Sequence, residues 1–230
     1  MKQRVHHHSS NVIIQNGDSL EFMFQVYDST YPRIPFRMQV QLIGGNYQAG
    51  DCSPLELFKR EICEEFSQDV ADHRAGVEKS LINVLGEGPG AQPTVNFAPL
   101  VDITTVRKEI LLAQPYQDFV YSVPELAGRL GFTGVTSIYH TSLNPETFER
   151  VRANIAKGLN IKNEGAASIA SVDDIQSGRT KCAWYSAEVL GRFLGMDLPQ
   201  LHGIRIEPIG LPQDSWESYL DRFEYEVAIM

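Results

Sequence analysis

Three glutamates stand close together in the run 60–65, which reads Arg-Glu-Ile-Cys-Glu-Glu. Glu61, Glu64 and Glu65 occupy positions i, i+3 and i+4, so on an α-helix their side chains project from one face. Carboxylates that close repel one another, whereas a face that serves only solubility more often alternates acids with lysines. A bound cation would remove the repulsion, and oxygen ligands suit Mg²⁺ or Mn²⁺. The spacing therefore predicts a divalent-cation site.

The elements that must position these acids are visible in the flanking sequence. Ser53 is a helix N-cap candidate, and Pro54 after it suits the first helical position, so both signals start the helix at the same place. Apolar residues at helical spacing would dock this helix on a core: Leu55, Phe58, Ile62 and Phe66. Upstream, the segment Phe36–Ile43 alternates well enough for a strand that runs into Gly44-Gly45. The expected order is strand, glycine turn, loop and helix.

The stretch 42–65 resembles the Nudix box. That pattern reads Gly, five residues, Glu, seven residues, Arg-Glu, an aliphatic residue, any residue, Glu-Glu, any residue, Gly. The positions that match are Gly45, Arg60, Glu61, Ile62, Glu64 and Glu65. Asp51 stands where the first Glu is expected, eight residues instead of seven separate it from Arg60, and Ser67 takes the last Gly position. The extra residue is most easily placed at Cys52, in the loop, where an insertion costs little.

The resemblance implies a hydrolase that cleaves a nucleoside diphosphate linked to another moiety, with Mg²⁺ or Mn²⁺ as cofactor. It makes Glu61, Glu64 and Glu65 the metal ligands, and it adds a main-chain carbonyl of Gly44 or Gly45. Metal ions would screen the phosphate charge and lower the pKa of bound water. A nucleotide sugar such as ADP-ribose is the favoured substrate, because the late part of the chain looks more like that branch.

Catalytic roles follow from the same resemblance. Arg60 would orient the carboxylates through charge-assisted hydrogen bonds. The general base comes either from the box helix, where Glu61 is the candidate, or from a late acidic loop, where Glu164 is the best-placed residue. Glu164 is equally well explained as a turn residue beside Gly165. Asp51 would either bind in the outer shell of the metal or cap its loop.

The family's fold is a mixed β-sheet between layers of helices, so the fold class expected here is α/β (α+β). Asn16-Gly17-Asp18 is a strong hairpin signal within Asn11–Tyr27. Further helices are expected at Val70–Leu85, Pro124–Leu130, Pro145–Leu159 and Ala183–Leu194, with a loop at Gly86–Gly90. Further strands are expected near Thr94–Leu100, Glu109–Ala113, Phe119–Val123 and Thr136–Leu143. Within Asn163–Ile175 an acidic loop, a strand and a helix start should follow one another, and the chain after Pro199 is unmatched.

Length and composition narrow the class of protein. The 230 residues suit one elaborated domain over 11–230, with residues 1–10, which include three consecutive histidines, as a mobile tail. A hydrophobic fraction of 43% with 21% charged residues is typical of a globular protein. The net charge of −9 disfavours a general nucleic-acid binder but not a small nucleotide. No segment has the ~20 apolar residues of a membrane span, and three cysteines form no CxxC pair, so a soluble, cytoplasmic protein is expected.

Other residues that can do chemistry are scattered. His73, His140 and His202 lack ligand spacing and are better explained as surface or hydrogen-bonded residues. Trp184-Tyr185 and Trp216 could stack on a base, although aromatics in such segments more often belong to a core or an interface. Two other functions stay open: a Nudix-like module that senses a nucleotide without cleaving it, and an interaction domain whose acidic helix faces a basic partner. A homodimer is possible through edge strands of the hairpin.

Overall fold

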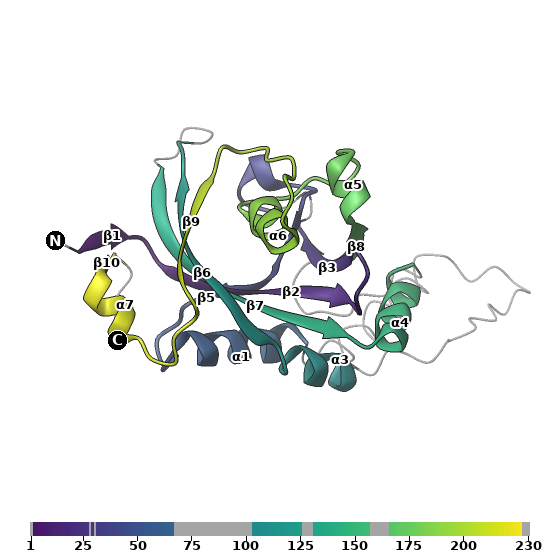
Figure 1. Ribbon diagram of the computed structural model, residues 1–230, viewed down its shortest axis with the longest axis horizontal. Coiled ribbons are helices and arrows are strands. Elements are labelled where there is room, and N and C mark those ends of the chain that lie inside the picture. The colour runs from purple at the N-terminus through teal and green to yellow at the C-terminus, as the bar shows by residue number, and fades with distance from the viewer. Residues whose placement is uncertain are drawn as a thin grey trace, which may run out of the picture.

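The structure is a computed structural model that describes residues 2–27, 29, 31–66, 103–125, 131–156 and 166–226. An eight-stranded mixed β-sheet lies between helices on its two faces (Figure 1). One face carries α1 (Pro54–Glu65), α3 (Ile103–Ile110) and α4 (Pro145–Ala156). The opposite face carries α5 (Val172–Gln176) and α6 (Ser186–Leu194). The α/β class expected from the sequence is confirmed.

The two faces of the sheet bury separate hydrophobic clusters because successive strand residues point in opposite directions. Val12 and Ile14 pack with the apolar side of α1 and with α3 and α4. Ile13, between them in the chain, packs with α5 and α6. The central strand is thus buried on both sides and anchors both layers of helices.

The central strand is β2 (His8–Asn16). Along one edge it pairs in parallel with β7 (Phe132–Leu143) over its whole length. The other named strands of this sheet are β3 (Glu21–Val26), β4 (Val40–Gln41), β5 (Ile43–Asn46), β6 (Gln114–Val123), β8 (Ala166–Ser171) and β9 (Arg205–Gly210). Their order across the sheet is β4-β3-β2-β7-β6-β9, with β5 also paired to β2 and β8 to β3.

The other edge of β2 is shared by two strands. Next to the turn, β2 pairs with β3 only at Ile14 with Met23 and Gln15 with Phe22. Further from the turn β2 pairs with β5 instead, and β3 pairs with β4. The hairpin strands therefore separate, and the segment 40–46 enters between them. Residues of all three strands beside this opening, among them Asn11, Gln25 and Gly44, line a pocket.

Several expected elements are confirmed. The hairpin around Gly17 is present, with Gly17 at φ 51°, a conformation that suits glycine. Strands are present where expected at the segments Phe119–Val123 and Thr136–Leu143, as parts of β6 and β7. α4 begins at Pro145, and a strand followed by a helix occupies 166–176. Ser171 caps α5 through a reciprocal pair of hydrogen bonds with Asp174.

Three expectations are corrected. Glu109–Ala113 is not a strand: Ile110 ends helix α3, where Val106 and Ile110 are buried four residues apart, and β6 begins at Gln114. Phe36–Ile43 is not one strand, because a 3₁₀ turn (Ile34–Phe36) precedes β4 and β5 starts only at Ile43. The last predicted helix begins at Ser186 and not at Ala183.

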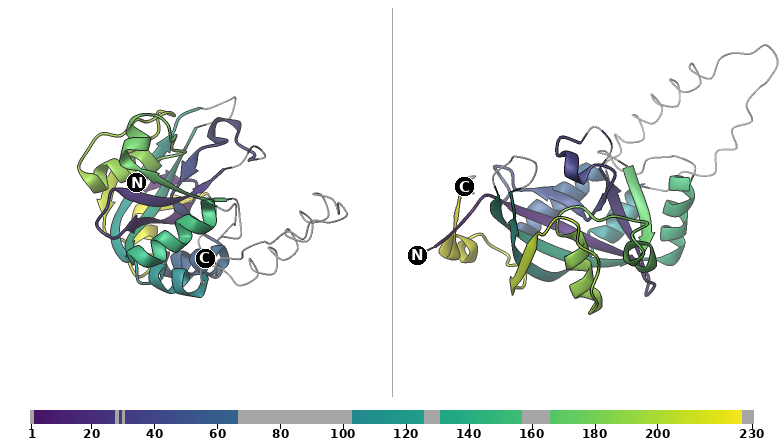
Figure 2. Two further views of the ribbon diagram at one scale, coloured as in Figure 1. Left: turned by 90° about the vertical axis from the view of Figure 1, so that its right-hand side faces the viewer. Right: turned by 90° about the horizontal axis from the view of Figure 1, so that it is seen from above.

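The ends of the chain differ from expectation as well. Instead of a tail over residues 1–10, β1 (Gln3–Val5) pairs in parallel with β10 (Phe223–Tyr225), and β2 begins at His8, which is fully buried. β1 and β10 lie beside α7 (Glu217–Arg222) at one end of the molecule (Figure 2). The stretch after Pro199 packs on the domain, and its strand β9 extends the main sheet beside β6.

Some expectations lie outside the described residues. These are the helix at Val70–Leu85, the loop at Gly86–Gly90, the strand near Thr94–Leu100, residues 126–130 of the helix at Pro124–Leu130 and the acidic loop with Glu164. In the part of the chain that is described, no helix has the length and apolar character needed to cross a membrane.

Candidate active site

The acidic helix begins where the sequence predicts. Ser53 is the N-cap of α1, and its hydroxyl oxygen accepts a hydrogen bond of 3.2 Å from the main-chain N–H of Glu56. Phe58, Ile62 and Phe66 are buried against the sheet, which confirms the predicted apolar face. The core contact fixes the rotation of α1 about its axis. The acids at 61, 64 and 65 are thereby turned toward one pocket.

The pocket has a volume of about 440 Å³ and lies at the opening between the separated hairpin strands. Glu61, Glu64 and Glu65 line it together with Gly44 and Gly45 of β5. Glu61 and Glu65 are buried, whereas Glu64 is exposed. The structure therefore places all three predicted metal ligands and both predicted glycines along one pocket.

Both glycines are required by close approach. Gly44 has φ 150°, and a Cβ there would lie 2.0 Å from the main-chain oxygen of Ser10. A Cβ on Gly45 would lie 2.2 Å from Oε2 of Glu61. Real Cβ atoms do not come within 3.0 Å of such atoms. The absence of a side chain at residue 45 is what lets the Glu61 carboxylate lie against β5.

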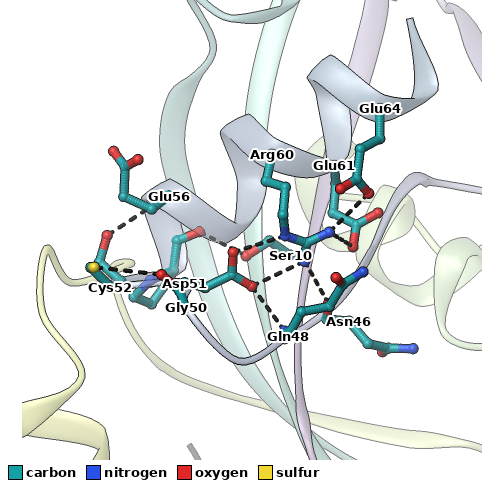
Figure 3. Close-up of polar contacts among 12 residues, drawn as sticks. Ser10, Asn46, Gln48, Gly50, Asp51, Cys52, Glu56, Arg60, Glu61 and Glu64 are labelled. Atoms are coloured by element: carbon teal, nitrogen blue, oxygen red, sulfur yellow. Dashed lines mark hydrogen bonds and ion pairs between the residues drawn. The ribbon is translucent and has the colours of Figure 1, made fainter. Parts of the chain in front are cut away.

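Arg60 holds the acids in place (Figure 3). Its Nε and Nη2 donate to the two carboxylate oxygens of Asp51 at 2.8 and 3.0 Å. Its Nη1 lies 2.9 Å from Oε1 of Glu61 and 2.9 Å from Oε2 of Glu64. Its Nη2 also donates to the main-chain oxygen of Asn46 at 2.9 Å. One guanidinium thus joins the helix, the loop and the end of β5, as expected for a positioning residue.

Asp51 anchors the loop between β5 and α1. It is buried, and its Oδ2 accepts a 2.9 Å hydrogen bond from the main-chain N–H of Gln48. Its main-chain oxygen accepts a 2.8 Å hydrogen bond from Nε1 of Trp216, near the start of α7. Both bonds fix the loop despite its additional residue. Of the two roles considered for Asp51, the structure supports the one within the loop.

Burial and neighbouring charge shift the protonation of this site. Burial raises the pKa of Glu61 to about 7; Arg60 opposes that rise, and the carboxylates of Glu64 and Glu65 add to it. The hydrogen bonds to Asp51 raise the pKa of Arg60 above its ordinary value, so the guanidinium stays charged. Glu61 can therefore change its protonation state near neutral pH, which is the behaviour required of a group that exchanges protons.

The fit of a metal ion can be judged from the donors. Within the described residues, no three His, Cys, Asp or Glu side chains are close enough to form a metal-binding group. Nη1 of Arg60 contacts both Glu61 and Glu64. The donors on this wall of the pocket are oxygens, which suit a hard cation such as Mg²⁺. The residues fit such an ion chemically, although their side chains do not converge on one point in this structure.

The floor of the pocket is a polar network that sequence reasoning missed. Asn11 donates from Nδ2 to the Tyr185 hydroxyl and to Oγ1 of Thr136, each at 3.0 Å. The Tyr185 hydroxyl also lies 3.1 Å from Oγ of Ser9. The available signal was in β2, where the polar residues Ser9, Ser10 and Asn11 directly precede the apolar run Val12–Ile14. Buried polar groups of this kind are retained only when satisfied.

The remaining candidate residues differ in their relation to this pocket. Glu164 lies outside the described residues, as does His73. His140 bonds Gln15 at 3.1 Å and His202 bonds Gln39 at 2.8 Å, which agrees with their interpretation as hydrogen-bonded residues. Trp184 and Tyr185 do line the pocket.

Comparison with known proteins gives likenesses among solved structures alone. No family model matches the chain, and no curated protein matches it. Among solved structures, the chain is similar to a mutT/nudix family protein from Listeria innocua, with 12% identity and a TM-score of 0.44. The match covers 84% of this chain and 94% of that chain. A likeness this remote carries no conclusion about function.

Proposed function

We propose that this chain is a Nudix-type pyrophosphohydrolase, dependent on Mg²⁺ or Mn²⁺, that cleaves a nucleoside diphosphate linked to another moiety. The observation that carries the proposal is the joint placement of Glu61, Glu64 and Glu65 on one pocket wall, against a glycine strand and tied by Arg60. Without a cation, this wall would repel a diphosphate. With one, the same oxygens become its ligands.

Each residue has a role in this proposal. Glu61, Glu64 and Glu65 would hold the cation, with a main-chain oxygen of Gly44 or Gly45 as an additional ligand. The bound cation would screen the phosphate oxygens and make water a better nucleophile. Arg60 keeps Glu61 in position through Nη1, and Glu61 is the described group best suited to take a proton from water. A nucleotide sugar such as ADP-ribose remains the favoured substrate within this class.

The rest of the pocket suits a nucleotide. Tyr27, Tyr31 and Trp184 line its other side and offer flat apolar surfaces. The side chains of Gln25, Gln41 and Asn46 add hydrogen-bonding groups. A site with aromatic surfaces and a small number of polar groups is the common form of a small-molecule site.

A second function has one observation in its favour. Because Arg60 already neutralises part of the acidic wall and no three acids converge in the described residues, the pocket could bind a nucleotide without cleaving it. Such a module would sense its ligand. Saturable binding without product would identify it.

The test is hydrolysis by the full chain of a panel of dinucleotides, nucleotide sugars and nucleoside triphosphates, with Mg²⁺ or Mn²⁺ and chromatographic detection of products. Glu64→Gln and Glu65→Gln should each lower turnover at least ~100-fold, because each removes a charged ligand. Both variants should keep the wild-type fold by circular dichroism, since neither residue belongs to the hydrophobic clusters.

Glu56→Gln is the matched control. It changes the same residue type on the same helix, but Glu56 is exposed and pairs with Lys59 at 3.0 Å, outside the pocket. Turnover in this control should stay within ~2-fold of wild type. Equal turnover in wild type, Glu64→Gln and Glu65→Gln would remove the proposed site. Nucleotide binding without product in any condition would replace the hydrolase with the sensor.

A further inference from the structure

Arg33 is a cation on the side of the pocket away from the acidic helix. It precedes the 3₁₀ turn Ile34–Phe36 and is half-buried. Within the described residues it forms no ion pair with a carboxylate, although the chain as a whole carries an excess of acids. The cations Arg60 and Arg152, by contrast, pair with acids from other elements. A half-buried guanidinium that lines a pocket and pairs with none of the described carboxylates points to an anionic ligand.

The Arg33 guanidinium lies over two aromatic rings. Its Cζ lies 4.6 Å from the centroid of the Trp184 ring and 5.5 Å from that of Phe132. Phe36, from the turn that follows Arg33, stacks on Trp184 with centroids 4.2 Å apart and planes 19° apart. Among the residues that the structure describes, the Arg33 guanidinium donates to no other group, so its N–H groups can serve a ligand. The two rings thus restrict where the guanidinium can lie in the pocket.

Trp184 is itself fixed at a cost in backbone strain. Its φ is 52°, in the left-handed region that bulky side chains rarely adopt. The chain before it is tied to β4, because the N–H of Ala183 donates to the oxygen of Val40 at 2.7 Å and Val40 donates to Lys181 at 2.9 Å. Strain of this kind persists where surrounding bonds enforce it, and it is concentrated at ligand sites.

The positive field of Arg33 reaches the pocket floor. His7 lines the same pocket and its Nε2 lies 2.9 Å from the Tyr121 hydroxyl. Burial, then His6 and Arg33, lower the pKa of His7 to about 4, so its ring is neutral near pH 7. The described lining of the pocket therefore has acids at one side, at 61, 64 and 65, and Arg33 as the charged residue at the other.

We infer that Arg33, stacked on Trp184, binds a second anionic group of the ligand, a phosphate monoester or a carboxylate on the part of the molecule remote from the pyrophosphate. The inference rests on the proposed function for the position of the pyrophosphate. It narrows the substrate class to nucleoside diphosphate derivatives that carry an additional negative charge. The cation held by the carboxylates at 61, 64 and 65 would then bind the pyrophosphate, and Arg33 would bind the second negative charge of the same ligand.

The test is calorimetric titration of the full chain with Ca²⁺ in place of Mg²⁺, so that a hard divalent cation screens the carboxylates at 61, 64 and 65 while hydrolysis is slowed. Two matched pairs distinguish the sources of charge: NAD⁺ against NADP⁺ for the phosphate monoester, and UDP-glucose against UDP-glucuronate for the carboxylate. Wild type should bind the more charged member of at least one pair about tenfold more tightly, as a charge-assisted hydrogen bond implies. Arg33→Gln should abolish the preference.

Arg33→Lys and Arg150→Gln complete the set. Lysine keeps the charge but not the flat stacked geometry, so it should retain only part of the preference. Arg150 is exposed and pairs with Glu146 on α4, so its loss should leave the preference unchanged. Equal affinities within both pairs, no binding of any of the four ligands, or a preference that survives Arg33→Gln would each overturn the inference. If the preference is found but protein supplemented with Mg²⁺ or Mn²⁺ releases no product, the subsite stands and the hydrolase fails.

Discussion

Glu61 and Asp118 are both buried acids, and burial raises the pKa of each, that of Glu61 to about 7 and that of Asp118 to about 6. Their surroundings differ. Glu61 lies on a pocket wall beside two other carboxylates, and its ionic partner Arg60 is the preceding residue. Asp118 lies in β6, and Oδ2 accepts a 2.5 Å hydrogen bond from the hydroxyl of Tyr219, on α7.

Asp118 belongs to a cluster with four aromatic residues, His8, Trp216, Tyr219 and Tyr225, which we call the Asp118 cluster. The rings of Trp216 and Tyr219 lie 4.9 and 4.8 Å from that of His8, which is fully buried. His8 donates or accepts through Nε2 to Ser137 at 2.9 Å and through Nδ1 to Tyr225 at 3.1 Å. Asp118 is not among the residues that line the described pocket around Glu61.

A buried carboxyl group with a raised pKa is therefore not by itself a functional site. Both groups have lost hydration, which accounts for the direction of both pKa shifts. Only Glu61 combines that loss with an open pocket and like charges within one helical turn. The Asp118 cluster instead joins α7 to the sheet, and we interpret it as structural.

The largest expected effect is the difference in turnover between variants of Glu61 and of Asp118. Glu61→Gln should lower turnover at least ~100-fold, because it removes a charged ligand and proton acceptor from the pocket. Asp118→Asn, the same chemical change, should leave turnover within ~3-fold of wild type. Steady-state product release at a temperature well below both unfolding midpoints makes the measurement.

Two outcomes would contradict the assignment of Glu61 to the active site and of Asp118 to a structural role. Similar losses in Glu61→Gln and Asp118→Asn would mean that the Asp118 cluster also belongs to the catalytic machinery. A fully active Glu61→Gln would restrict the site to Glu64 and Glu65. Circular dichroism of both proteins shows that any loss is not due to unfolding.

The two regions also differ in how much of each could be predicted from the sequence. Gly45, Arg60 and Glu61 lie within 17 residues, so cap, spacing and glycine signals were all local and the site helix was predicted correctly. The bond between Tyr219 and Asp118 joins residues 101 apart, and that between Trp216 and Asp51 joins residues 165 apart. No local pattern encodes such pairings.

The errors have the same physical origin. Three consecutive histidines looked like a tail because the aromatic partners of His8 come from the other end of the chain. Arg33 carried no motif, since its place beside Trp184 depends on the pairing of Val40 with the chain before Trp184. The strand predicted near Glu109–Ala113 is instead the end of α3, because the burial of Val106 and Ile110 in the core favours a helix there.

The next effect is a pH dependence of stability. Burial raises the pKa of Asp118 to about 6 in the folded state, from its ordinary value of 3.8, so between these pH values the native state binds more protons than the unfolded state. The stability contributed by this group is present below pH 4 and is lost as pH rises through 6. Asp118→Asn removes that dependence. Its free energy of unfolding relative to wild type should therefore rise by up to about 3 kcal/mol between pH 4 and pH 7.

Urea unfolding of both proteins at half-unit pH intervals measures this difference. The rise should be complete slightly above pH 6, and the same series on Glu61→Gln, without metal, should extend to about pH 7. A difference between Asp118→Asn and wild type that stays constant with pH would mean that Asp118 is hydrated in the native state. In that case its assignment to a closed cluster would be wrong.

The smallest expected effect concerns the hydroxyl that closes the Asp118 cluster. Tyr219→Phe removes the donor to Asp118 and the acceptor of a 2.9 Å bond from the N–H of Gln213, and leaves both groups without that partner. The free energy of unfolding should fall by about 1–2 kcal/mol at pH 7.5, where Asp118 is ionised. Tyr116→Phe is the control, because Tyr116 is only partly buried and should cost less than about 0.5 kcal/mol. Equal stability of both variants would show that α7 is held by ring packing alone. Since that packing also carries Trp216 to Asp51, turnover per folded molecule should be unchanged in Tyr219→Phe, and a parallel fall in turnover would join the two regions into one functional unit.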